Sequence, residues 1–419
     1  MELQLHSTPR KRIVALAAAA LCSVYVLVAG RLFVASLYGG KAEFAALRQA
    51  ARLDPWNADY RNNLGRYYAL AARDPAASLE PYRAALQLNP HSARYWFDLA
   101  SAYQVLGDVP QQTRALEHAI DADPTTPDVA WEAANLYLVQ GEDRKALREF
   151  RVVLENEPNL APAAIQLCWR IQPDAAALLR DVVPVRSEAY VAFLDLLMRK
   201  QETAGAAKVW AAMVASPQPF ELRYANEYLE YLLNHHEVEQ ARLVWRQAAP
   251  RFGFSGYLPS ERNLIVNGDF SLDVLNGGFD WRYEKQPSVT LTLDPSDFHG
   301  GHRSLLITFD GPGVVDAGIR QFVVVQPDTR YQFSAYYKNG EIEGAGGPHF
   351  TIQDFYTRAI YYDSDDLKEA GFWKSASGDF TTGADSKLLV LHVRRVPEGS
   401  PIRGKLWVDD FRLVPQRPQ

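Results

Sequence analysis

Four prolines recur at an almost constant spacing in the first half of this 419-residue chain. Pro55, Pro90, Pro124 and Pro158 are separated by 35, 34 and 34 residues, and each lies in a short polar turn. A fixed period of this length predicts stacked helical pairs, because no single pair can bury its apolar face alone. The period therefore indicates an α-helical array over residues 41–251.

The residues between these prolines recur in the same order from one unit to the next. The two clearest units carry Trp96, Leu99, Tyr103, Gly107, Leu116 and Ala119, then Ala133, Tyr137, Gly141, Ala146 and Phe150. This pattern closely resembles the tetratricopeptide repeat. We count about six units, with an irregular one after Pro158 and one extra residue near Arg73 that accounts for the 35-residue step.

The resemblance implies a superhelix whose concave groove is lined by the first helix of each pair and binds a protein partner. Matching the units places these residues towards the groove: Asn62, Arg66, Arg94, Phe97, Ser101, Gln104, Trp131 and Asn135. The alternative is that Phe97 and Trp131 pack between helices and that the polar residues are ordinary surface. No motif specifies the partner.

An apolar run of eighteen residues, 13–30, follows three basic residues near the amino terminus. Its length suits a membrane-spanning helix, and the preceding charges favour a cytoplasmic amino terminus. We expect a cytoplasmic segment at 1–12 and a single transmembrane signal anchor at 13–38 in a bacterial inner membrane. The rest of the chain would then lie in the periplasm. A cleaved signal peptide is the competing interpretation, because small residues follow the run.

The composition changes after residue 251 from helix-favouring residues to Gly, Thr, Val and aromatic residues. In β-strand alternation, Tyr331, Phe333 and Ala335 fall on one face, and their neighbours fall on the other. Further alternating runs separated by Gly-rich turns predict a linker at 252–261 and an antiparallel β-sandwich at 262–415. The predicted fold is thus multidomain: a membrane helix, an α-superhelix and a jelly-roll sandwich.

The motifs of this second region also follow a familiar order. They are NLIVNGDF from Asn263, FDWRY with Trp281, FHGGHRSLLI with Gly300, and the closing GKLWVDDFRL. They resemble the jelly-roll carbohydrate-binding modules appended to bacterial xylanases, within the broader galactose-binding-like fold. The resemblance implies a sandwich that binds glycan.

Sugar sites combine an aromatic ring, which stacks on C–H faces, with polar groups that bond hydroxyls. Tyr336 with Gln332 and Ser334 fits this description on one sheet face, and further candidates are Phe355, Tyr356 and Tyr361. Solvent-facing tyrosines are also ordinary on β-sheets, so each remains a hypothesis.

Many modules of this family hold a structural calcium ion, which a carboxylate on the last strand helps to bind. The resemblance makes Asp409 or Asp410 the candidate for that carboxylate here. Alternation places Asp409 on the core face, where a carboxylate requires an ion or a hydrogen-bond network. Ser271 stands where the family usually has an acidic residue, which weakens the calcium prediction.

Charge and motif content exclude several other classes. Lysine and arginine total 44 against 50 acidic residues, a net charge of −6, which disfavours nucleic-acid binding. The cysteines, Cys22 and Cys168, are too few for a disulfide framework or a zinc cluster. No HExxH or phosphate-loop motif is present, and no GxSxG occurs in a strand-to-helix context.

These features predict a non-catalytic, membrane-anchored envelope scaffold that requires no cofactor. Its repeats would bind a protein and its sandwich a polysaccharide, in a system that makes, exports or attaches extracellular polysaccharide. One alternative is an assembly factor that binds only protein. A less favoured one is a hydrolase or lyase that acts on polysaccharide.

Overall fold

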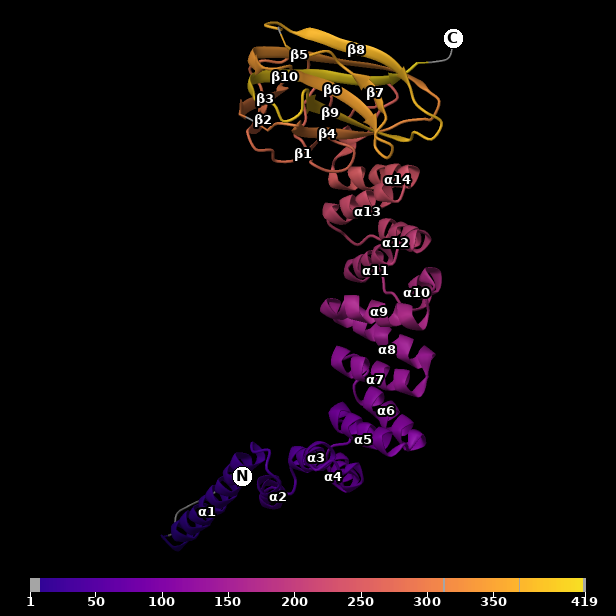
Figure 1. Cartoon of the computed structure of the whole chain (residues 1–419). Helices are drawn as coiled ribbons and strands as arrows, with labels where there is room; N and C mark the ends of the chain where they lie inside the picture. The colour runs from indigo at the N-terminus through magenta and orange to yellow at the C-terminus, as the bar shows by residue number, and fades with distance from the viewer. Residues whose placement is uncertain (1–7, 312, 369, 417–419) are drawn as a thin grey trace. The chain divides into compact units, whose positions relative to one another are not determined.

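The computed structural model describes residues 8–311, 313–368 and 370–416. The chain divides into two compact units, Met1–Gln218 and Pro219–Gln419. Helices form the first unit and open the second, and two antiparallel sheets follow (Figure 1). The predicted fold class is confirmed.

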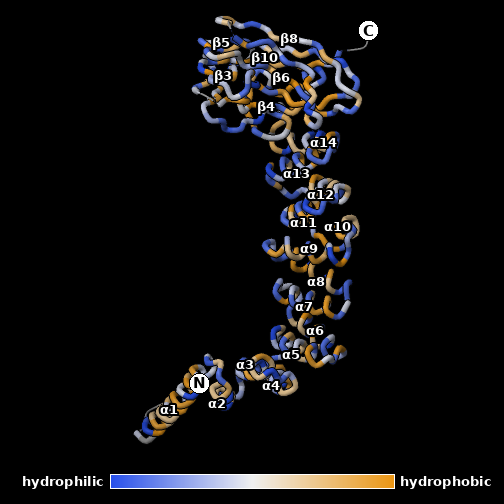
Figure 2. Tube along the Cα trace, viewed as in Figure 1, coloured by the Kyte–Doolittle hydropathy of each residue, from blue (hydrophilic) through white to orange (hydrophobic). Residues whose placement is uncertain are grey.

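Helix α1 (Thr8–Gly39) contains the apolar run. Its Lys11–Gly39 segment is long and apolar enough to cross a membrane, by length and composition. Most of its side chains are exposed, and the helix is the most continuously apolar one in Figure 2. Residues 1–7 of the predicted cytoplasmic segment lie outside the described residues.

A single helix, α2 (Phe44–Leu53), follows, and then six helical pairs occupy the described part of the array. Five pairs belong to the first unit: α3 (Ala58–Arg66) with α4 (Pro75–Leu88), α5 (Ala93–Leu106) with α6 (Val109–Ala122), α7 (Pro127–Gln140) with α8 (Asp143–Asn156), α9 (Ala161–Ile171) with α10 (Ala175–Asp181), and α11 (Ser187–Arg199) with α12 (Thr203–Ala215). The sixth, α13 (Leu222–Asn234) with α14 (Val238–Ala248), belongs to the second unit. The irregular unit corresponds to the short helix α10.

Glycines that recur between units terminate the first helices of the pairs, and recurring alanines allow the helices to pack closely. Gly107 and Gly141 follow α5 and α7 with φ of 74°, the left-handed conformation that terminates a helix at low cost. Ala85 and Ala119 are fully buried where helices approach closely. The repeated small residues therefore have the packing role that their periodicity predicts.

The extra residue of the first pair is absorbed inside its first helix. Residues Tyr67–Ala71 form a π-helical turn directly after α3, and the Ala72 amide donates to the Tyr67 carbonyl over 3.0 Å. One inserted residue widens a helical turn in this way without disturbing the pairing.

The sandwich consists of two five-stranded antiparallel sheets, ordered β1-β4-β9-β6-β7 and β2-β3-β10-β5-β8. The strands are β1 (Arg282–Tyr283), β2 (Val289–Asp294), β3 (Ser304–Gly311), β4 (Asp316–Val324), β5 (Arg330–Gly344), β6 (Pro348–Asp354), β7 (Ile360–Asp363), β8 (Lys374–Thr381), β9 (Leu388–Arg395) and β10 (Ile402–Pro415). We call the first sheet A and the second sheet B.

Aromatic rings from distant parts of the sequence fill the space between the sheets. Phe270 stacks on Trp281 with ring centroids 5.2 Å apart, and Phe411 of β10 meets the Trp281 ring edge-on at 4.9 Å. Tyr331, Phe333 and Ala335 of β5 are buried, as their alternation predicts. The core therefore leaves the outward rows of each sheet for solvent or ligands.

The pair α13–α14 is joined to the sandwich within the second unit. Trp245 donates from Nε1 to the Tyr257 carbonyl over 2.9 Å, and Asn226 Oδ1 accepts the Gly278 amide at 3.0 Å. The predicted linker contains the short turn Ser255–Tyr257, and Tyr257 is itself buried. The last helical pair thus packs as part of the carboxy-terminal unit.

Candidate glycan-binding faces and helical groove

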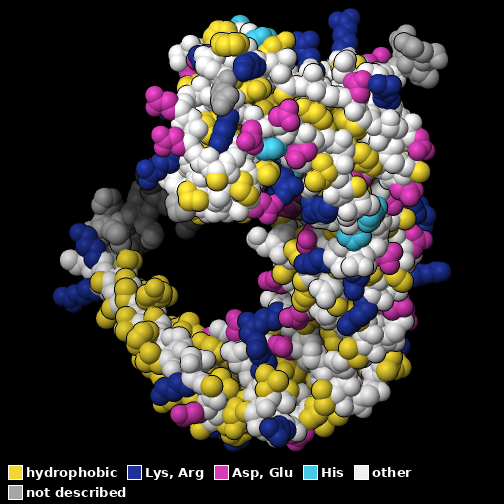
Figure 3. Space-filling model, turned by 45° about the horizontal axis from the view of Figure 1, so that its top comes forward, with side chains coloured by type: hydrophobic (Ala, Val, Ile, Leu, Met, Phe, Trp, Pro, Cys, Tyr) yellow, Lys and Arg dark blue, Asp and Glu magenta, His cyan; other side chains and the backbone are white. Residues whose placement is uncertain are grey.

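The outward face of sheet A carries polar side chains in register across four strands. Arg320 of β4 lies opposite His392 of β9, His392 lies opposite Thr351 of β6, and Thr351 lies opposite Asp363 of β7. A second row places Asp316 beside Arg394 and Arg394 beside His349. In Figure 3, histidine, acidic and basic side chains are visible together on the sandwich. We call these two rows the polar face.

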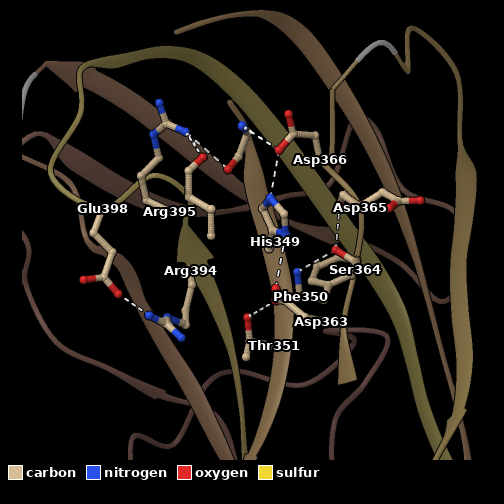
Figure 4. Close-up of polar contacts among 12 residues, drawn as sticks. His349, Phe350, Thr351, Asp363, Ser364, Asp365, Asp366, Arg394, Arg395 and Glu398 are labelled. Carbon is tan, nitrogen blue, oxygen red and sulfur yellow. Dashed lines mark hydrogen bonds and ion pairs between the residues drawn. The ribbon is translucent and has the colours of Figure 1, made fainter. Parts of the chain in front are cut away.

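His349 is held between two aspartates at one end of the polar face (Figure 4). Its Nε2 lies 2.8 Å from Asp366 Oδ1, whereas its Nδ1 lies 3.8 Å from Asp363 Oδ2, beyond hydrogen-bond length. Thr351 donates to the other Asp363 oxygen over 2.7 Å. Burial acts to raise the pKa of Asp366, but hydrogen bonds from His349 and the Gly347 amide outweigh it and lower that pKa.

His392 repeats this arrangement on the neighbouring strand. Its Nδ1 lies 2.6 Å from Asp316 Oδ2, while its Nε2 is buried without a hydrogen-bond partner. His349 Nδ1 is likewise buried without one. A buried polar atom without a partner is costly, so these two ring nitrogens are the least satisfied polar atoms of this face.

One end of the polar face is covered by residues of the same unit. Phe322 of β4 points outward yet is only 6% exposed. The Arg282 guanidinium lies over its ring at 4.6 Å, and Glu230 of α13 forms an ion pair with Arg282. Helix α13 therefore sets where the accessible polar face ends.

The predicted sugar residues lie at three separate places. Tyr336, Gln332 and Ser334 share the outward row of β5, on sheet B. The Tyr336 ring stacks on His299 with centroids 3.6 Å apart, and Trp373 meets His299 edge-on at 5.9 Å. This aromatic group lies on the other sheet from the polar face.

The remaining sugar candidates make internal contacts. Tyr356 follows β6, stacks on His236 at 3.9 Å and donates to the Leu233 carbonyl, while Phe355 packs edge-on against Phe322 at 5.2 Å. Tyr361 of β7 lies with its hydroxyl 2.7 Å from Ser386 Oγ, and its ring stacks on Phe380. These contacts give all three rings a packing role.

Sequence reasoning missed His349, Thr351, His392 and Arg394. Their signal was available, since HFTIQD and LLVLHVRR place polar residues at alternate positions between apolar ones. Alternation alone does not show that the two strands are neighbours, which only the sheet order establishes.

Asp409 is fully buried on β10 and has a hydrogen-bond network, one of the two expected solutions. Its Oδ2 accepts the His299 and Gly300 amides at 2.7 and 2.9 Å, and its Oδ1 accepts the Asp410 amide. Burial nevertheless raises its pKa to about 6. Asp410 contacts His299 Nδ1 at 2.6 Å.

Amide donors already occupy both Asp409 oxygens, which does not suit a cation at the same atoms. Among the described residues, no group of three or more His, Cys, Asp or Glu side chains is placed to hold a metal. Calcium at Asp409 or Asp410 stays a prediction, and no role is derived from it.

The groove candidates gather around a carboxylate that the sequence reasoning did not single out. Asn62 is buried and donates to Asp98 Oδ2 over 2.6 Å. Burial raises the pKa of Asp98, against the opposing effects of the Asn62 hydrogen bond and the charges of Arg66 and Arg94. Burial also raises the pKa of Glu132, and the Asp98 charge adds to the shift.

The other groove candidates differ in accessibility. Phe97 is 5% exposed and so belongs to the packed interior. Trp131 meets Phe150 edge-on at 5.7 Å, and Asn135 donates to the Trp131 carbonyl over 2.8 Å. Gln104 is half-buried and Ser101 is exposed. Asn62 and Phe97 are therefore inaccessible, whereas the other candidates are half-buried or exposed: Arg66, Arg94, Ser101, Gln104, Trp131 and Asn135.

Known proteins are similar to this chain in two separate regions, the sandwich and the helical repeats. The model of a family described as a carbohydrate binding domain matches residues 262–398. No curated protein matches the chain. A solved structure described as CBM4 is 16% identical, covering 36% of this chain and 99% of its own, with a TM-score of 0.29.

Two helical structures are similar to the repeat region. MamA is 22% identical, covering 38% of this chain and 88% of its own, with a TM-score of 0.30. PilF of Pseudomonas aeruginosa is 15% identical, covering 48% of this chain and 93% of its own, with a TM-score of 0.24. The carboxy-terminal region is thus similar to a carbohydrate-binding family, as its motifs predict.

Proposed function

We propose that this protein is a non-catalytic envelope scaffold anchored in a bacterial inner membrane. Helix α1 anchors the chain, the helical repeats bind a protein partner, and the sandwich binds a polysaccharide on the periplasmic side. This arrangement suits a system that makes, exports or attaches an extracellular polysaccharide.

The observation that carries the glycan role is the polar face within a region that matches a carbohydrate-binding family. Its registered rows place hydrogen-bond donors and acceptors side by side over several strands. Sugar hydroxyls both donate and accept, so they suit a surface where carboxylates, imidazoles and guanidinium groups alternate. The Tyr336 group on sheet B is the second candidate face.

The test is affinity electrophoresis of the full chain in detergent against a panel of bacterial envelope polysaccharides. His392→Gln should reduce the retardation of the band if the polar face binds, and Tyr336→Ala should reduce it if sheet B binds. His302→Gln, in an exposed loop, is the matched control for the histidine change. Absence of binding to every polysaccharide would refute the glycan role.

Two further measurements separate the alternatives. Recovery of a stable protein partner through the sandwich, without glycan binding, would favour an assembly factor that binds only protein. Release of reducing sugar by the purified protein would contradict the non-catalytic assignment and support a hydrolase.

A further inference from the structure

A pocket of about 510 Å³ opens between helices α4, α5 and α6 of the first unit. This volume lies within the range of volumes that ligand-binding pockets of proteins have. Its lining comprises Arg83, Leu86, Gln87, Pro90, Trp96, Leu99, Tyr103, Gln111, Arg114, Ala115 and His118. None of these is a groove candidate, and two of the three helices are second helices of their pairs. The pocket is therefore distinct from the predicted groove.

The charge of this pocket opposes that of the chain. Two arginines and a histidine line it, and no aspartate or glutamate does, although the whole chain carries a net charge of −6. Arg83 donates to the Tyr103 hydroxyl over 2.7 Å, which fixes one guanidinium at the wall. Arg114 has no hydrogen bond or ion pair to another described residue. Uncompensated guanidinium groups of this kind favour a carboxylate.

The remaining wall is apolar and rigid. Trp96 donates from Nε1 to the Pro90 carbonyl over 2.8 Å, and its ring stacks on His118 at 4.5 Å. Leu86, Leu99 and Ala115 are buried beside it. Side-chain amides of Gln87 and Gln111 complete the lining. The pocket thus offers an apolar surface next to cationic and amide donors.

We propose that this pocket binds an acidic segment of a protein partner, in which a glutamate or aspartate adjoins an apolar side chain. The carboxylate meets Arg83 and Arg114, and the apolar side chain packs against Trp96. A peptide is favoured over a sugar acid because the wall includes three aliphatic side chains, which contribute little to sugar hydroxyls. The inference does not depend on glycan binding or on the groove.

The test is fluorescence polarisation of the full chain in detergent with a labelled twelve-residue probe peptide in which glutamate alternates with leucine. The same peptide with glutamine in place of glutamate is the charge control. We expect saturable binding of the acidic peptide that weakens as NaCl is raised, since partly exposed charge pairs are screened.

Arg114→Gln should weaken binding about tenfold, the loss of one charge-assisted hydrogen bond. Arg114 pairs with none of the residues that the structure describes, so this variant should keep the wild-type melting temperature. Gln111→Glu should weaken binding by adding a like charge, and Arg144→Gln, an exposed arginine on α8 outside the pocket, should leave it unchanged.

Equal binding of the acidic and glutamine peptides, or an unchanged affinity in Arg114→Gln, would overturn the proposal. A glucuronate oligomer that binds in the pocket when the acidic peptide does not would overturn the peptide assignment. Loss of glycan binding by the sandwich would leave these measurements unaffected, so the two proposals fail independently.

Discussion

Tyr356, in the turn after β6, donates a 2.7 Å hydrogen bond to the carbonyl oxygen of Leu233 in α13. The same ring stacks on His236, at the turn before α14. A sandwich tyrosine and the last helical pair therefore share one packed interface inside the second unit.

The fragment Pro219–Gln419 should be more stable than a fragment that begins at residue 262. The shorter fragment loses Glu230, which pairs with the partly buried Arg282, and it loses the helical contacts of Tyr356. We expect its melting temperature to fall by roughly 5–10 °C, given two or more kcal/mol of lost contacts. Calorimetry measures this difference, and equal melting temperatures would show that the helical pair contributes nothing.

Asp280 should make stability depend on pH. It is fully buried, and burial raises its pKa to about 6, although the Leu275 amide donates to it over 2.7 Å. The folded state holds this proton more tightly than the unfolded state. The stabilisation is therefore complete below the ordinary aspartate pKa and is lost as pH rises through about 6.

Asp280→Asn should remove this dependence. At pH 7 the variant should exceed the wild-type protein by about 2 kcal/mol in unfolding free energy, whereas at pH 4 the two proteins should be equally stable. Thermal unfolding at both pH values measures the change, with Asp385→Asn on the exposed surface as the control. A variant that is less stable at pH 7 would contradict the assignment.

Gly65 should resist substitution although it lies in a helix. A Cβ atom there would lie 2.5 Å from Cδ1 of Tyr82, whose side chain is 2% exposed and unable to move away. Gly65→Ala should therefore destabilise the first unit by about 1–3 kcal/mol despite a better helix propensity. Gly205→Ala is the matched control, because its Cβ would lie no closer than 3.3 Å to a neighbour. Thermal unfolding by circular dichroism should separate the two variants.

Removal of residues 1–39 should release the protein from membranes. The segment Lys11–Gly39 is the candidate membrane span among the described residues. In fractionated cells, the full chain should resist extraction at alkaline pH, whereas the truncated protein should be soluble. Alkaline phosphatase fused after Gln419 should be active if the carboxy terminus is periplasmic, and an inactive fusion at normal abundance would reverse the orientation.

Local patterns predicted most of the fold because each pattern has a direct structural cause. The proline period equals the length of one helical pair, and the alternation along β5 indicates which residues face the core. The extra residue near Arg73 was also visible as a longer step. Its accommodation as a π-helical turn at Tyr67–Ala71 depended on the pairing of α3 with α4, which holds the neighbouring turns in place.

The candidate sites depended on contacts between distant residues. His392 and Thr351 are separated by 41 positions in the sequence but are direct partners between β9 and β6. The cationic pocket likewise needs Arg83 and Arg114 from different helical pairs. Neither grouping has a local signature, so residue type and spacing did not identify them.

The sequence by itself determined the helical array, the β-sandwich, the apolar amino-terminal helix and the likeness to carbohydrate-binding modules, because periodicity follows from helix and strand geometry. Only the tertiary structure decided which outward residues become neighbours, that Asp409 is satisfied by backbone amides, and that α13–α14 packs with the sandwich. Strand order and helix pairing bring together residues far apart in the chain, and the physical environment of a side chain is set there.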